Sequence, residues 1–273
     1  MTPKGDAFSQ FEYEGWERAA GKYESVWSGL TRLFIPYLLE AARVVPDSRL
    51  LDVACGPGYV AEAARARGAT PAGVDFSPGM VRLARSRNAG IPFRIGDACD
   101  LDFEDESFDV VVMNFGALHL SDPEAAFAEA RRVLRPGGRY GFTAWASPAQ
   151  SPGTRVVEEA IEAHADLNVD VPAGPDPFGY GDAGACRQVL SRSGFDPTSL
   201  TFRTVTVEWE VPSASFVFDA ERDAGVRTTA LLAAQTPDAL AAIRGHIVSA
   251  LQPYARGKAF SIPYAAHVIV ATV

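Results

Sequence analysis

One turn constrains the fold of this 273-residue chain more than any other segment. An apolar, strand-like run at residues 49–54 gives way to Cys55-Gly56-Pro57-Gly58, and a second apolar run, 71–74, ends at Asp75. Glycine lacks the Cβ atom that disfavours positive φ angles, so the turn can be sharp and its backbone can approach a ligand closely. Asp75 follows Gly56 by nineteen residues, the approximate spacing at which a second parallel strand brings a carboxylate to a ribose diol. The pattern predicts a nucleotide-cofactor site.

Asp52 bears on which nucleotide this site binds. The segment 56–61 also satisfies the G-x-G-x-x-G/A fingerprint of dinucleotide-binding proteins, so the turn alone leaves that alternative open. Asp52 stands four residues before Gly56 in an otherwise apolar strand. A carboxylate there would not attract a pyrophosphate, which is also negatively charged, but it would stabilise a cationic amino or sulfonium group. Asp52 therefore favours a cationic cofactor; the alternative is an acid paired at the end of its strand, because an uncompensated buried carboxylate is unfavourable.

Five segments follow one another between residues 45 and 146: 50–58, 73–80, 93–98, 108–114 and 132–140. In order and spacing they resemble the motifs of the class I S-adenosylmethionine-dependent methyltransferases, in the branch that contains ubiquinone and menaquinone biosynthetic enzymes. The first segment departs from the family's D-x-G-x-G-x-G at one position, where Ala54 replaces a glycine. The resemblance implies a Rossmann-like α/β fold, with a doubly wound, mostly parallel seven-stranded sheet and an antiparallel last strand.

The resemblance also assigns residues to the cofactor S-adenosyl-L-methionine. Asp52 and the loop 54–58 are implied to hold its methionine end, and Asp75 is implied to accept from both ribose hydroxyls. For Cys55, packing as a small buried hydrophobe remains the alternative. The full set implied to bind the cofactor is Tyr23, Asp52, Ala54, Cys55, Gly56, Gly58, Asp75, Phe76, Met80, Asp97, Ala98, Asn114 and Phe115.

The second and third segments are implied to surround the adenine. Phe76 and Met80 would flank the ring, and Asp97 and the Ala98 N–H would meet its polar edge. The chemistry is consistent, because adenine offers an amino donor that a carboxylate accepts and a ring nitrogen that accepts from a main-chain N–H. Asn114 ends the fourth predicted strand, so it lies at the carboxyl edge of the sheet, where open parallel sheets bind ligands.

His119 is the candidate general base. It follows Asn114 by five residues, near the point where a methyl group would meet its acceptor. A histidine with an unperturbed pKa of about 6.5 accepts a proton at neutral pH. In related methyltransferases a histidine at this place also packs beside the cofactor without taking part in the chemistry, so a structural role stays open.

The rest of the chain is arranged around this core within a single predicted methyltransferase domain, 1–273. Residues 1–46 are predicted to form two amphipathic helices, the first with an aromatic face that includes Trp16, Tyr23 and Trp27, and the second over 30–41. Within the core, 47–146, a βα alternation predicts a parallel sheet with helices at 59–67, 78–87 and 123–134. Later helices are predicted at 153–164, 182–193 and within 213–255, and the family's antiparallel sixth and seventh strands at 200–211 and 260–273.

The segments 147–181 and 212–256 are predicted to form a cap over the methyl acceptor, because every cofactor motif precedes them. The candidate substrate-binding residues are all aromatic: Trp16, Trp145, Phe178 and Tyr180. Aromatic side chains at the mouth of a site favour a small organic acceptor with a substantial apolar part. The sequence specifies neither the atom that is methylated, oxygen, nitrogen or carbon, nor the oligomeric state.

Charge and cysteine content disfavour several other classes of protein. A net charge of −9 and a pI of about 5.0 argue against a nucleic-acid partner, because a phosphate backbone is repelled without a dense basic patch. No apolar run approaches the roughly eighteen residues that span a bilayer, and residues 1–10 lack a signal-peptide core, so we expect a cytoplasmic protein without membrane insertion. The cysteines Cys55, Cys99 and Cys186 form no C-x-x-C pair, which disfavours disulfides and a metal site.

The expected activity is methyl transfer from S-adenosylmethionine to a small, partly apolar acceptor, with release of S-adenosylhomocysteine. Two other classes remain as alternatives. The first, an NAD-dependent dehydrogenase, is supported only by the fingerprint match at 56–61, and both Asp52 and the segment 96–98 argue against it. A non-methylating protein on the same fold, either a cofactor-binding partner or a cyclase that uses the sulfonium charge, is not distinguished by any sequence feature.

Overall fold

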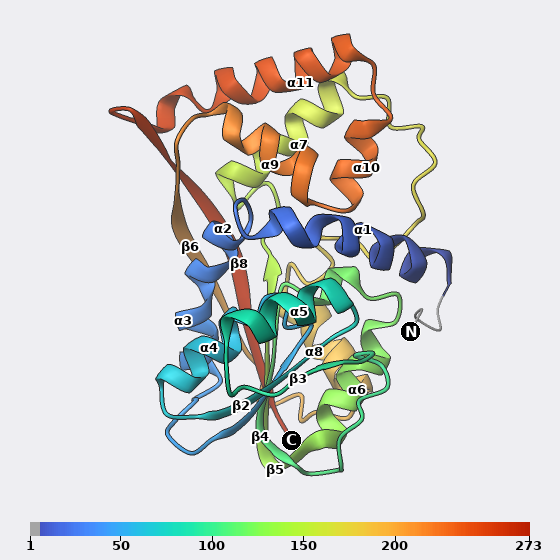
Figure 1. The fold of residues 1–273 in the computed structure, drawn as a ribbon, viewed down its shortest axis with the longest axis vertical. Helices are drawn as coiled ribbons and strands as arrows, with labels where there is room; N and C mark the ends of the chain where they lie inside the picture. The colour runs from blue at the N-terminus through green and yellow to red at the C-terminus, as the bar shows by residue number, and fades with distance from the viewer. Residues whose placement is uncertain (1–5) are drawn as a thin grey trace.

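A mixed sheet in the order β3-β2-β1-β4-β5-β8-β6 forms the centre of the computed structural model, which describes residues 6–273 (Figure 1). Strands β1 to β5 pair in parallel, whereas β8 is antiparallel to both β5 and β6. The two-residue β7 pairs with β8 beside this path. The strands are β1 (Arg49–Val53), β2 (Thr70–Asp75), β3 (Phe93–Ile95), β4 (Phe108–Asn114), β5 (Leu134–Trp145), β6 (Thr201–Val211), β7 (Ala255–Arg256) and β8 (Ala259–Thr272).

The predicted fold class is confirmed, with one refinement of strand direction. The last long strand, β8, is antiparallel to the others, as expected. The preceding strand, β6, was expected to be antiparallel as well, and it is antiparallel to β8. Since β8 itself opposes β5, β6 runs in the direction of the parallel strands.

Most helices lie within a few residues of their predicted positions. They are α1 (Ala7–Tyr23), α2 (Ser28–Thr31), α3 (Ile35–Ala41), α4 (Tyr59–Ala66), α5 (Pro78–Arg87), α6 (Pro123–Val133), α7 (Pro152–His164), α8 (Ala183–Arg192), α9 (Ser215–Ala224), α10 (Arg227–Ala233) and α11 (Pro237–Ala250), with 3₁₀ turns η1 (Arg32–Phe34), η2 (Ala117–His119) and η3 (Gln252–Tyr254). Side chains cap several N-termini: Ser77 accepts from Met80 N–H, and Asp122 accepts from Ala125 N–H. A proline follows each of these capping residues. The first N–H groups of a helix have no partner within the helix, so the N–H that proline lacks removes no hydrogen bond. No helix among residues 6–273 is long and apolar enough to cross a membrane.

The N-terminal region is more broken than the sequence predicts. The first helix ends at Tyr23, so Trp27 lies outside it, at the cap of the short α2. The predicted helix 30–41 is divided into α2, η1 and α3. Pro36 explains the division, because it lacks the N–H that a continuous helix requires and is tolerated in the first turn of α3. Residues 1–5, part of the first ten residues assessed for a signal peptide, lie outside the described residues.

The carboxyl ends of the parallel strands face α1, which crosses between the sheet and a group of later helices (Figure 1). This group, the cap helices α7, α9, α10 and α11, lies at one end of the molecule. Helix α1 contacts α5 on the sheet side and α9 on the cap side. The strand ends Asp75 and Asn114 are therefore brought to the space beneath α1, where a ligand site is expected for a sheet of this topology.

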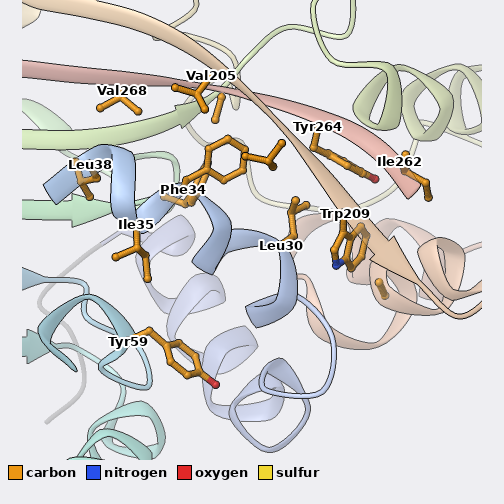
Figure 2. Packing of buried hydrophobic residues seen from close by; sticks show 14 of the residues in the cluster. Leu30, Phe34, Ile35, Leu38, Tyr59, Val205, Trp209, Ile262, Tyr264 and Val268 are labelled. Carbon is orange, nitrogen blue, oxygen red and sulfur yellow. The ribbon is translucent and has the colours of Figure 1, made fainter. Parts of the chain in front are cut away.

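The N-terminal helices α2 and α3 are anchored in the main hydrophobic core. Figure 2 shows Leu30 of α2, Phe34 of η1 and Leu38 of α3, which belong to one buried cluster with Val205 and Val268 of the last strands. Phe34 is completely buried, and its ring lies 5.3 Å from that of Phe115 and 6.1 Å from that of Trp145, measured between centroids. Packing of these aromatic rings joins the N-terminal region to the strand ends.

We expect Phe34→Ala to lower the free energy of unfolding by about 3–5 kcal/mol, since it leaves a cavity in a closely packed core. The adjacent Leu33→Ala is the matched control, because Leu33 is 37 % exposed and its truncation should change stability by about 0.5 kcal/mol or less. Urea denaturation of both variants measures the difference. Equal losses in the two variants would show that α2 and α3 are not anchored through Phe34.

Candidate active site

A cavity of about 550 Å³ lies between the carboxyl edge of the sheet, α1 and the cap helices. Its volume is in the range typical of small-molecule sites. Most of the predicted site residues line it: Trp16, Tyr23, Ala54, Gly56, Asp75, Phe76, Met80, Asp97, Ala98, Asn114, Phe115, His119, Trp145 and Phe178. The structure thus brings together the cofactor motifs, the N-terminal helix and aromatic residues of the later chain.

A smaller pocket of about 40 Å³ adjoins the main cavity and contains two further predicted residues, Asp52 and Cys55. The two spaces share Tyr23, Ala54 and Asn114 in their walls. Cys55 is also buried against the small apolar cluster beneath α5. Cys55 therefore packs as a small buried hydrophobe and also forms part of the predicted cofactor loop.

The glycine turn adopts the backbone conformation that its sequence predicts. Gly56 and Gly58 have φ angles of 51° and 81°. Gly58 lines neither pocket; it precedes α4, and a Cβ atom there would lie 2.7 Å from the ring of Phe93. Ala54, which replaces the family's glycine, also has a positive φ of 54°, a strained conformation for a residue with a side chain. Opposite it stands Gly116, where a Cβ would come within 2.8 Å of the Ala54 Cβ.

Asp75 holds the turn and the following loop through both of its carboxylate oxygens. Oδ2 accepts from Gly56 N–H at 2.8 Å, and Oδ1 accepts from Ser77 N–H at 2.9 Å. The residue is only 5 % exposed, and burial raises the pKa of Asp75 to about 6 although these two hydrogen bonds oppose the shift. Each carboxylate oxygen has a further lone pair, so the group can still accept two hydrogen bonds from a diol in the cavity.

Asp52 is buried at the end of β1 beside the smaller pocket. Its Oδ2 accepts from Ala61 N–H in the first turn of α4 at 3.2 Å, but Oδ1 has no hydrogen-bond partner among residues 6–273. Burial raises the pKa of the Asp52 carboxyl well above its usual value, and the charge of Asp75 adds to this. An unpartnered buried carboxylate oxygen is unfavourable by itself, and a cationic group in the adjoining space would remove that penalty.

Other predicted cofactor residues are fixed by hydrogen bonds of their own. The Asn114 amide donates to Thr31 O at 3.3 Å and accepts from the Thr143 hydroxyl at 2.8 Å. Asp97 accepts from Cys99 N–H at 2.9 Å. The Tyr23 hydroxyl lies 3.1 Å from Thr31 Oγ1, and burial raises the pKa of Tyr23 to about 12. These contacts orient polar groups in the wall before any ligand binds.

Glu17 is a functional candidate that the sequence did not indicate. From α1 it accepts hydrogen bonds from the Ser77 hydroxyl and, at 2.7 Å, from Gly79 N–H in the first turn of α5. Arg82 lies 3.8 Å from its other oxygen. Glu17 therefore fastens the N-terminal helix onto the loop that carries Asp75 and Phe76.

His119 lies in a charged cluster whose other members were also missed. Its Nδ1 is 2.9 Å from Oε2 of Glu12, a completely buried residue of α1. The other Glu12 oxygen is 3.5 Å from Arg227 Nε, and Arg227 also donates to the Leu118 and Pro175 carbonyls. A carboxylate on Nδ1 favours the tautomer with its proton on that nitrogen, which leaves the lone pair of Nε2 as an acceptor.

Aromatic side chains form the wall between the cofactor motifs and the cap. Phe115 and Trp145 are stacked with centroids 4.0 Å apart, and Trp16 meets His119 edge-on at 4.9 Å. Phe178 also lines the cavity. The wall suits a flat apolar group between polar ends.

Tyr180 does not belong to this wall, contrary to expectation. It is buried in a separate core cluster, with its ring 5.9 Å from Phe127 and 5.4 Å from Phe142 between centroids. A tight turn, in which Gly181 N–H donates to Phe178 O at 2.8 Å, redirects the chain toward α8. Phe178 and Tyr180 consequently face different environments.

Comparison with known proteins agrees with the fold and the motifs. The family described as "Methyltransferase domain" matches residues 51–142. A demethylmenaquinone methyltransferase of Renibacterium salmoninarum is 37 % identical over 133 residues, 49 % of this chain and 56 % of that protein. The chain spans 56 to 66 % of the length of three such relatives.

Two further comparisons extend over nearly the whole chain. The phosphoethanolamine N-methyltransferase 2 of Haemonchus contortus, solved with S-adenosyl-L-methionine, aligns with a TM-score of 0.56 at 18 % identity, over 98 % of this chain and 60 % of that one, which supports the fold. The nocamycin O-methyltransferase of Saccharothrix syringae is 32 % identical over 267 residues, 91 % of this chain and 93 % of that protein. Together with the sheet order and the five motifs, this identifies the chain as a member of the class I S-adenosylmethionine-dependent methyltransferases.

Proposed function

We propose that this protein transfers a methyl group from S-adenosylmethionine to oxygen, nitrogen or carbon of a small, partly apolar organic acceptor and releases S-adenosylhomocysteine. The observation that carries the proposal is that one cavity is lined both by acids at the strand ends, Asp75 and Asp97, and by aromatic residues, Trp145 and Phe178. The names of the relatives, a demethylmenaquinone methyltransferase and a nocamycin O-methyltransferase, support a small-molecule acceptor. The net charge of −9 supports the same class over nucleic acid.

The cofactor-binding part of the proposal rests on groups that fit S-adenosylmethionine. The free lone pairs of Asp75 would accept from the ribose hydroxyls, and the unpartnered Oδ1 of Asp52 suits the cationic amino group at the methionine end. Asp97 and the Ala98 N–H would meet the adenine edge, with Phe76 and Met80 beside the ring. When bound, this cofactor supplies an electrophilic methyl group on its sulfonium.

The protein's own contribution would be alignment, exclusion of water and removal of a proton. The stacked Phe115 and Trp145 fix the direction from which an acceptor approaches. His119, held by Glu12 with Nε2 free, would take the acceptor's proton. Glu12 acts as a positioning residue, because it touches the histidine and not the cavity contents.

The later segments would choose the acceptor. Within a single methyltransferase domain, 1–273, we assign 1–46 to covering the cofactor, 47–146 to binding it, and 147–181 and 212–256 to the cap. Support comes from the cavity wall, to which the cap contributes Phe178, Glu158 and Glu221. We place the protein in the cytoplasm in this proposal because Cys55, Cys99 and Cys186 are all free thiols.

The direct test of the proposed activity uses cofactor labelled in its methyl group and a panel of phenols, naphthoquinols and aromatic amines. We expect release of S-adenosylhomocysteine together with a labelled product for at least one chemical class. Tight binding of the cofactor without turnover on the whole panel, or preferential binding of NAD, would contradict the proposal.

We expect cofactor binding to depend on pH through the ionisation of Asp75. Its pKa of about 6 means that the free protein protonates this acceptor as pH falls, so affinity is full above the pKa and is lost below it. If the cofactor requires ionised Asp75, affinity for S-adenosylhomocysteine should fall about tenfold between pH 7 and pH 5. Titration calorimetry measures this.

Two variants distinguish the effect of Asp75 on cofactor affinity from that of another carboxylate. Asp75→Asn should bind weakly and without the pH dependence, because its amide offers one acceptor oxygen in place of two. Asp102→Asn, at an exposed acid that pairs with Arg94, should retain the wild-type profile. A wild-type affinity that is constant down to pH 5 would exclude Asp75 as the titrating acceptor.

We expect His119→Ala to lower turnover about 10²- to 10⁴-fold with little change in cofactor affinity, as for loss of a general base. Added imidazole should restore part of the lost turnover, because it can occupy the vacated space beside Glu12. His164→Ala, at an exposed histidine of α7, is the control. Near-normal turnover of His119→Ala on the acceptor found by screening would assign His119 a packing role only.

A further inference from the structure

A second group of polar residues lines the cap side of the cavity, outside all five cofactor motifs. Its members come from four elements: Thr154 and Glu158 on α7, Glu221 on α9, Thr228 on α10 and Tyr264 on β8. None of them contributes to the cofactor contacts described above. We call these five residues the cap subsite.

Tyr264 presents a buried hydroxyl without a partner. The residue is 3 % exposed, and its hydroxyl oxygen forms no hydrogen bond with the described residues. The ring is held beside Trp209, with centroids 5.6 Å apart (Figure 2). It also packs so closely on Gly153 that a Cβ there would lie 2.2 Å from the ring. Because a buried hydroxyl normally finds a partner, the position favours a ligand group that bonds to it.

Glu158 and Glu221 are two acidic side chains without a counterion in the described chain. Neither lies within 4.0 Å of a cationic side chain among residues 6–273. Their surroundings are low in polarity: burial raises the pKa of Glu221 to about 8 and the nearby charge of Glu158 adds to the shift. Burial raises the pKa of Tyr264 well above its usual value, and the charge of Glu221 adds to this. Glu158, Glu221 and Tyr264 line the same cavity.

The cavity offers these carboxylates no cation of its own from the described chain. Arg227 is the one arginine or lysine among the described lining residues. Its guanidinium is engaged by Glu12 and by two backbone carbonyls. A cation for the cap subsite must therefore come with a ligand.

Aromatic rings lead from the cofactor motifs to the cap subsite. Trp145 lies 6.4 Å from Tyr264 and 6.5 Å from Trp27, measured between centroids, and stacks on Phe115. Aromatic faces attract cations as well as apolar groups. The cavity wall is thus flat and apolar near the cofactor motifs, and it offers a hydrogen-bond acceptor and two acids in the cap subsite.

We propose that the cap subsite binds a protonated amine carried by an aromatic or similarly apolar methyl acceptor. The ammonium would donate to the Tyr264 hydroxyl oxygen and to Glu158 and Glu221, while the apolar part lies against Trp145. A neutral donor such as an alcohol would bond to the hydroxyl but would not stabilise the ionised form of either acid. This inference rests on the proposed methyltransferase function only for the statement that the amine is part of the acceptor.

Two probes of equal size test the subsite: 2-phenylethylamine and its neutral counterpart 2-phenylethanol. Titration calorimetry is performed on the full chain, both free and loaded with S-adenosylhomocysteine. We expect the amine to bind about tenfold or more tightly than the alcohol, as for a charge-assisted interaction. The double variant Glu158→Gln/Glu221→Gln should lose this preference, while its affinity for S-adenosylhomocysteine is unchanged.

Two single variants complete the design. Glu159→Gln, next to Glu158 but exposed and paired with Arg155, should keep the amine preference. Tyr264→Phe, which removes only the hydroxyl, should weaken amine binding about three- to tenfold. Equal binding of the two probes, or a preference that survives in the double variant, overturns the subsite. An amine preference in a protein that binds neither S-adenosylmethionine nor S-adenosylhomocysteine would instead overturn the proposed function and leave the subsite in place.

Discussion

The Asp75 carboxylate is the interaction on which the rest of the site depends. It ends β2 and accepts from Gly56 N–H in one loop and Ser77 N–H in the next, so it fixes the glycine turn relative to the start of α5. Glu17 then binds the same start of α5 through the Ser77 hydroxyl and Gly79 N–H. Asp75 thus orients the turn and the second loop, and Glu17 joins α1 to that loop.

The two sides of the cavity have different physical origins. On the cofactor side, backbone groups and acids stand at strand ends, and parallel pairing of the sheet fixes their positions. On the cap side, Glu158, Glu221 and Tyr264 come from two helices and the last strand and act through side chains alone. If the proposed cap subsite recognises the acceptor, substitution of its side chains would change acceptor recognition while the strand-end groups of the cofactor side stay in place. The family match to residues 51–142 accordingly covers the cofactor side.

The sequence predicts the sheet and the cofactor loop well because both depend on local patterns. Apolar runs, glycines and strand-end acids lie within short segments, and Asp75 and Asn114 occur where those patterns place them. Contacts over long sequence separations were not predictable: Glu12 meets His119 across 107 residues, and Glu17 meets Gly79 across 62. In sequence, both acids resemble exposed positions of an amphipathic helix. Tyr180 was misplaced because a turn of four residues decides which core it enters.

The central claim, that Asp75 accepts from a ribose diol, is tested most directly by a thermodynamic cycle. Affinities of wild type and Asp75→Ala are measured for S-adenosylhomocysteine and for its analogue that lacks both ribose hydroxyls. Charged hydrogen bonds contribute about 1.5–3 kcal/mol, so wild type should favour the parent compound by about 10- to 150-fold, and the variant should bind the two compounds almost equally. An undiminished preference for the parent compound in Asp75→Ala would contradict the account, because the hydroxyls would then be recognised elsewhere.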